Sequence, residues 1–224
     1  MAGLQLLSAG GLVIGGEEEA RSPMQVSLMS LGGNGYRYAG FTGTIGAALA
    51  ANSEVLQFRF LSGAKTFALV EKIMFDGSAI IAAATAAGPL GFMVNPARAW
   101  TAAGSGGTRI AVSGDNLQME TAINNSQVSD LGIATTGALT AGTKTIDANG
   151  IGQCIGGAGT AAITALGGNT TLITPQPLFD ATAGGERLVL ANQEGFVIRT
   201  THAGPASLTY VAGFTVQWRE VSAY

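Results

Sequence analysis

Side chains that could act as a nucleophile or a base are few. The chain contains one histidine, His202, and one cysteine, Cys154. Ser-His and Cys-His catalysis needs a histidine base held by a third group, whereas His202 begins the turn-like sequence HAGP. Cys154 lies between glycines and next to Ile155, which favours a small buried filler over a reactive thiol. We therefore predict no catalytic residue.

Metal-binding side chains are equally sparse. Glu17, Glu18 and Glu19 form the only acidic cluster. Three adjacent carboxylates cannot converge on one ion without a special backbone, so we interpret the triplet as a solvated loop. One histidine and one cysteine cannot build a zinc site within a single chain, although copies of His202 around a trimer axis remain an alternative. We predict no metal and no cofactor.

Two glycine-rich segments approach nucleotide-binding patterns without matching them. In residues 137–145 (GALTAGTKT), Thr143 separates the second glycine from the lysine, so the loop amides and the lysine cannot converge on one phosphate. We interpret this segment as a loop leading into a short strand. Residues 150–156 (GIGQCIG) miss the dinucleotide fingerprint by one position, and no acidic residue follows between Asp147 and Asp180 to hold a ribose.

Aromatic side chains raise the question of glycan binding. Trp100 and Trp218, together with the tyrosines, are candidates for a sugar platform. Trp218 falls on the apolar face of a predicted strand, which favours core packing. For Trp100, both core packing and glycan binding remain alternatives. Carboxylate pairs for glycoside hydrolysis are defined by distance in space, which a sequence does not show. Charged residues are too sparse to favour that chemistry, so we expect that the protein is not an enzyme.

The composition indicates a protein that associates with other subunits. Of 224 residues, 34 are glycine and 11% are charged, against about 25% in an average soluble protein. Such a surface is poorly protected against association, and we favour one that other subunits largely cover. The net charge of −3 and the scattered basic residues argue against a nucleic-acid partner, and we expect none. The longest apolar tract, residues 79–94, is too short to span a bilayer and contains Gly88-Pro89, so we expect no membrane partner.

The clearest structural pattern is the alternation in residues 207–221 (SLTYVAGFTVQWREV). One parity carries the apolar side chains Leu208, Tyr210, Ala212, Phe214, Val216 and Trp218. This period of two predicts a long strand with one face in the core, and Gly213 predicts a bulge within it.

The remaining elements are also predicted to be strands. Residues 55–62 and 66–75 alternate around a turn and predict a hairpin. The small-residue tract 79–94 predicts a helix or a buried loop, and residues 150–170 a long loop. Short strands are expected at residues 91–97, 108–113, 131–135, 144–147, 170–174, 187–191 and 195–201. Eight to ten strands with turns between them predict an all-β fold, an antiparallel β-sandwich or jelly roll, over residues 51–224.

Residues 1–50 show no sustained periodicity, apart from a short strand candidate at residues 24–31. We interpret them as an extended N-terminal arm that reaches a neighbouring molecule.

Several segments carry a resemblance to a known class. Residues 188–201 (LVLANQEGFVIRTT) and 214–224 (FTVQWREVSAY) resemble the C-terminal end of β-sandwich structural proteins of tailed bacteriophages. So do residues 95–112 (NPARAWTAAGSGGTRIAV) with 132–147 (GIATTGALTAGTKTID). The resemblance covers roughly residues 55–224, implies a virion location and transfers no site residue.

The expected function follows from this resemblance and from the composition. We expect a capsid decoration or cement protein, a homotrimer that binds the major capsid protein and bridges capsomers on the virion surface. It would be made in the cytoplasm of the host bacterium. A tail, baseplate or fibre component that binds a host glycan is the alternative, and a virion-associated polysaccharide hydrolase is a third.

Overall fold

The computed structural model describes residues 6–7, 13–14, 34–46, 49–82, 84–112, 119, 126–158, 174–182 and 185–223. The chain divides into two units, Met1–Leu31 and Gly32–Tyr224. In the first unit, β1 (Leu6–Leu7) and β2 (Val13–Ile14) pair antiparallel. The strand candidate at residues 24–31 and the Glu17–Glu19 triplet lie outside the described residues.

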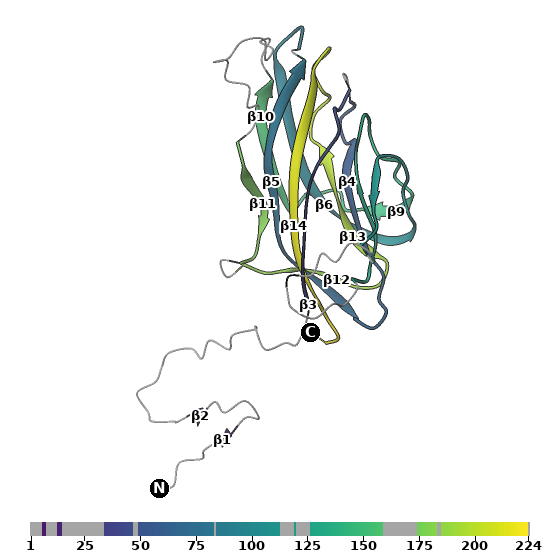
Figure 1. Ribbon diagram of the computed structural model, residues 1–224, viewed down its shortest axis with the longest axis vertical. Coiled ribbons are helices and arrows are strands. Elements are labelled where there is room, and N and C mark those ends of the chain that lie inside the picture. The colour runs from purple at the N-terminus through teal and green to yellow at the C-terminus, as the bar shows by residue number, and fades with distance from the viewer. Residues whose placement is uncertain are drawn as a thin grey trace. The chain divides into compact units, whose positions relative to one another are not determined.

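The second unit is an antiparallel β-sandwich, as predicted, and no helix occurs in its described residues (Figure 1). The larger sheet has the order β10-β6-β13-β4-β8-β7, with β9 also paired to β6. Its strands are β4 (Glu54–Phe60), β6 (Gly88–Ala102), β7 (Thr108–Ile110), β8 (Val128–Ile133), β9 (Thr143–Ile146), β10 (Gly152–Ala158) and β13 (Glu194–Thr200). The finer assignment of a jelly roll stays a prediction.

The smaller sheet has the order β11-β5-β14-β3, with β12 also paired to β5. Its strands are β3 (Asn34–Phe41), β5 (Phe67–Ala82), β11 (Gln176–Asp180), β12 (Leu188–Leu190) and β14 (Thr209–Val221). In Figure 1, β14 runs beside β5 over almost its whole length, in agreement with their register from Thr209↔Ala82 to Val221↔Phe67.

The prediction for residues 207–221 is confirmed. All six side chains of the apolar parity are buried, and β14 is an interior strand between β5 and β3. The register with β5 shifts between Gly213 and Phe214, so the expected bulge is present. A side chain at Gly213 would meet the ring of Phe41 at 2.7 Å, which gives this glycine a packing role as well.

Aromatic contacts across the core join the two sheets. Phe58 of β4 meets Trp218 of β14 edge-on, with ring centroids 5.1 Å apart. Phe92 of β6 stacks on Phe75 of β5 at 5.3 Å and meets Phe214 edge-on at 5.4 Å. Such pairs add about 0.5–1.5 kcal/mol each beyond the area that they bury. The predicted core therefore lies between the sheets.

Three sequence predictions are wrong, one about strand pairing and two about secondary structure. The expected hairpin of residues 55–62 and 66–75 does not form, because β4 and β5 belong to different sheets. Alternation looks the same for strands that pair edge to edge and for strands that face each other across a core. Residues 79–94 contain the end of β5 and the start of β6, and β10 occupies part of the loop expected at residues 150–170. In both segments cross-strand pairing overrides the weak strand propensity of Ala and Gly.

The predicted arm is also too long at its C-terminal end. β3 pairs with β14 from Asn34↔Glu220 to Phe41↔Gly213 and forms an edge of the smaller sheet. Residues 34–41 (NGYRYAGF) bury Tyr36 and Tyr38, an alternation too short and too rich in glycine to be recognised in the sequence. The boundary predicted at residue 50 therefore falls inside the sandwich. The strand candidate at residues 170–174 lies almost wholly outside the described residues.

Candidate functional site

The structure separates the residues with the chemistry of a nucleophile or a base. His202 is exposed in the turn after β13, and its Nδ1 atom lies 2.8 Å from Thr201 Oγ1. Cys154 is buried on β10 opposite Phe92, as expected for a filler. Burial raises the pKa of its thiol to about 11, so at neutral pH it holds its proton and is a poor nucleophile. Neither residue forms a site with the other.

The two glycine-rich segments end in strands of the larger sheet. Residues 137–145 form a loop that leads into β9, as predicted, and residues 150–156 lead into β10. The lysine of the first segment, Lys144, is not directed at an anion site. Its ammonium group is buried within the protein.

Both tryptophans are fully buried, so neither forms a sugar platform. Trp218 lies in the core between the sheets, as preferred. Trp100 lies on the other face of the larger sheet, where it packs with Ala97, Val197 and Ile146. The backbone at Ala99 has a φ of 49°, which redirects the strand just before Trp100. The indole Nε1 donates to Ala102 O at 3.0 Å.

Trp100 lies beside a group of buried and half-buried polar side chains on β4, β7, β8 and β9. We call this group, together with Trp100, the Glu54 cluster. Its members are Glu54, Gln57, Trp100, Arg109, Asp130 and Lys144. Gln57 is fully buried, and the side chain of Lys144 is only 1% exposed. The cluster lies on the outer face of the larger sheet, under the loops that join β6 to β7 and β8 to β9. The larger sheet therefore has a buried polar layer opposite its apolar core.

One carboxylate oxygen is the centre of the cluster. Glu54 Oε2 accepts from Lys144 Nζ at 2.8 Å and from Gln57 Nε2 at 2.5 Å. Gln57 Nε2 also donates to Thr140 O at 2.7 Å, and Lys144 Nζ donates to Ala141 O. An amine and a carboxamide are thus held against the same carboxylate.

The other side of Gln57 faces a second ion pair. Arg109 Nη1 donates to Gln57 Oε1 at 2.9 Å and to Asp130 Oδ1 at 2.8 Å. Asp130 Oδ2 accepts from Gly104 N at 3.3 Å. A side chain at Gly104 would meet Gln57 Oε1 at 2.3 Å, so only glycine allows the loop to close over the amide. Two cations and two anions balance within the cluster.

The pKa of Lys144 reflects two opposing effects, burial of its amine and the neighbouring carboxylate of Glu54. Burial lowers its pKa, and the hydrogen bond and charge of Glu54 oppose that shift. The Nζ atom lies 4.3 Å from the centroid of the Trp100 ring, a distance at which the ring attracts a cation. The cluster therefore lowers the pKa of this amine while it holds the amine against a carboxylate.

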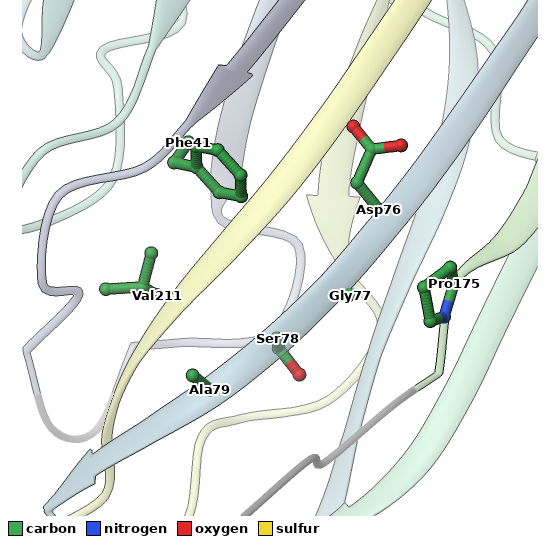
Figure 2. Close-up of a pocket in the computed structure, with 7 residues that line it drawn as sticks. All are labelled: Phe41, Asp76, Gly77, Ser78, Ala79, Pro175 and Val211. Carbon is green, nitrogen blue, oxygen red and sulfur yellow. The ribbon is translucent and has the colours of Figure 1, made fainter.

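A second feature is an open hollow of about 320 Å³ on the outer face of the smaller sheet (Figure 2). Its lining is Phe41, Asp76, Gly77, Ser78, Ala79, Pro175 and Val211. Phe41 is 69% exposed. Figure 2 shows Phe41 and Asp76 on either side of the β14 ribbon. A side chain at Gly213 of β14 would collide with both of them. Asp76 Oδ2 accepts from Thr215 Oγ1 at 2.7 Å.

Comparison with known proteins does not add to this description. No protein-family model, curated protein or solved structure matches the chain. Within the described ranges, no group of three His, Cys, Asp or Glu residues is placed to hold a metal ion. A membrane-crossing helix is likewise lacking in this part of the chain.

The sequence analysis missed the Glu54 cluster. Its six members come from five separate segments, and each segment carries only one or two polar residues. The one available signal was polar Gln57 and Arg59 within the apolar strand 55–62, where they occupy the parity opposite Phe58. In a strand with one apolar face, polar residues at this parity are also typical of a face exposed to solvent.

Proposed function

We propose that this protein is a structural subunit of a tailed-phage virion, a decoration or cement protein that binds the capsid surface as a homotrimer. Its action is mechanical: the sandwich adds interface area between capsomers and so stabilises the shell. The proposal includes that the protein is not an enzyme and that neither nucleic acid nor membrane is its partner.

The observation that carries the proposal is an apolar patch on the outer face of the smaller sheet. Phe41 and Ile81 are 69% and 51% exposed. Val211 of β14 is paired with Ala79 of β5. Both residues line the same hollow as Phe41. Large apolar side chains that are exposed together on one face favour a protein–protein contact. We call these four residues the Phe41 patch.

The construction of the sandwich supports a mechanical role. Buried ion pairs such as Lys144–Glu54 stay inside the domain, and aromatic pairs join the sheets along their length. The segments that resemble phage proteins contribute to β6, β7, β8, β9, β12, β13 and β14, which together make up much of both sheets. The resemblance therefore concerns mainly the framework of the domain.

The proposal is tested by locating the protein and by disrupting the patch. Cryo-electron microscopy of particles of the virus that encodes the chain should show the sandwich on the capsid surface. In a binding assay with emptied capsids, Ile81→Asp should weaken binding at least tenfold. Ile155→Asp is the matched control, because Ile155 is 60% exposed on the other sheet and should leave binding unchanged. A protein found only on the tail would overturn the capsid assignment.

The hollow supports a second candidate, a tail or fibre component that binds a host glycan. An exposed aromatic ring packs against a sugar face, and a carboxylate such as that of Asp76 accepts hydroxyl groups. A glycan array would test it: binding by the wild type that is lost in Phe41→Ala favours this candidate over the capsid. Degradation of an arrayed glycan would favour the hydrolase alternative.

A further inference from the structure

The Glu54 cluster brings together the groups that two side chains need to form an amide bond with each other. We propose that Lys144 Nζ attacks the side-chain amide of Gln57, with Glu54 transferring the protons, to form an intramolecular isopeptide crosslink with release of ammonia. The chemistry is independent of the function proposed above. It requires no oxidant and no cofactor.

The nucleophile and the leaving group are neighbours. Lys144 Nζ and Gln57 Nε2 both donate to the single atom Glu54 Oε2, at 2.8 and 2.5 Å. Holding reactants in contact converts a slow bimolecular reaction into a unimolecular one with a high effective concentration. Glu54 touches both nitrogen atoms, as a group must if it takes a proton from one and gives it to the other.

The electrophile is polarised from the opposite side. Arg109 Nη1 donates to Gln57 Oε1 at 2.9 Å, so a fixed positive charge lies where negative charge develops in the tetrahedral intermediate. Asp130 holds the guanidinium at 2.8 Å, and the missing side chain at Gly104 leaves room over the same oxygen. The side-chain amide of Gln57 is therefore hydrogen-bonded at both its oxygen and its nitrogen.

The site also lowers the pKa of the amine and buries the reacting groups. Glu54, Gln57 and Trp100 are buried, and the Lys144 side chain is 1% exposed. Burial lowers the pKa of Lys144, which reduces the cost of removing its proton. Burial of Gln57 also limits hydrolysis of its amide, which would compete with attack by the amine.

In the proposed reaction, the amine of Lys144 replaces the NH2 group of Gln57. The Lys144 ammonium group gives one proton to Glu54, and the neutral Nζ attacks Gln57 Cδ, forming an N–C bond. The second proton from Nζ passes through Glu54 to Nε2, the Cδ–Nε2 bond breaks, and ammonia leaves. Ammonia takes the first proton from Glu54 and departs as ammonium, so Glu54 is regenerated as a carboxylate.

The product would join β4 to β9 covalently. β9 pairs with β6, and the loop before it covers Glu54 through the bond from Leu139 N to Glu54 O. A covalent link here prevents this covering segment from separating from the sheet when the domain is pulled or heated. This is a useful property for a structural protein.

Intact-mass measurement of the purified full chain tests the proposal. After incubation of the folded protein at neutral pH, its mass should be lower than the sequence mass by one ammonia molecule. Succinimide formation at Asn149, which precedes Gly150, would give the same loss. Tandem mass spectrometry of a digest must therefore find the peptide of Gln57 linked to that of Lys144. Folded wild-type protein that keeps its full sequence mass would overturn the proposal.

Variants assign the roles of the three groups. Lys144→Met and Glu54→Gln should keep the full sequence mass, with circular dichroism used to verify that they fold. Lys72→Met is the matched control, because Lys72 forms an ion pair with Asp180 at the surface and should leave the ammonia loss intact. A loss that persists in Lys144→Met and that the peptide map does not assign to a succinimide would contradict the crosslink. Should the variants fail to fold, the wild-type mass and peptide map still decide the matter.

Discussion

The indole Nε1 of Trp218 donates a hydrogen bond of 3.0 Å to the Oε1 atom of Glu220, two residues further along β14. The same carboxylate accepts from Ser126 Oγ at 2.5 Å and from Gln127 N at 2.9 Å. Glu220 is fully buried, and the donors around it come from its own strand and from the segment before β8. This buried carboxylate thus joins the smaller sheet to a segment that leads into the larger one.

Glu220→Gln should lower the free energy of unfolding by about 2 kcal/mol, since hydrogen bonds to a charged group contribute more than neutral ones. In the variant, the NH2 group of the glutamine would also face Ser126 Oγ, Gln127 N or Trp218 Nε1, which act as donors to the carboxylate. Urea denaturation followed by tryptophan fluorescence measures the change. Glu186→Gln, at an exposed position between β11 and β12, is the matched control and should change stability by less than about 0.5 kcal/mol. Equal stability of the two variants would contradict the prediction.

Gly195→Ala should destabilise the domain by about 2–3 kcal/mol through overpacking. A Cβ atom at this position would lie 2.0 Å from Phe58 O and 3.0 Å from the Trp100 ring, so the backbone of β4 would have to move. Gly157→Ala provides the comparison, because its Cβ would meet nothing within 4 Å. Thermal unfolding of both variants tests this, and a stable Gly195→Ala would mean that β13 and β4 do not approach this closely.

The carboxyl group of Asp180 should titrate at an unusually low pH. The Thr182 hydroxyl, more than the ion pair with Lys72, lowers its pKa to about 2. A depressed pKa stabilises the fold above the unfolded-state value of about 4, and this contribution is lost as the pH falls through about 2. In an NMR titration, Thr182→Val should raise this pKa towards its ordinary value and Lys72→Met should raise it less. The reverse order would contradict the assignment.

Cys154 should resist maleimide at neutral pH, because its thiol is buried and its raised pKa keeps it protonated. Labelling should require opening of β10 and become fast in urea. Ile155→Cys in a Cys154→Ala background places a thiol one residue away on the exposed face and should react at least about a hundredfold faster. Similar rates for the two proteins would show that Cys154 is accessible.

Local patterns were enough to predict part of the molecule. The alternation of Leu208 to Trp218 identified β14, its buried face and the bulge at Gly213, because a strand buried on one face repeats every two residues whatever it pairs with. The burial of Cys154 and the turn position of His202 were also predictable from their immediate neighbours.

Other features were decided only by the tertiary structure. The same alternation in residues 55–75 could not tell a hairpin from two strands that face each other across the core. The Glu54 cluster could not be seen in the sequence because Gln57, Arg109 and Lys144 meet only when β4, β7 and β9 come together in the larger sheet. The sequence by itself determined which side chains alternate, since that depends on the pleat of one strand. Which strands pair, and which polar groups are buried together, was decided by contacts between residues far apart in the chain.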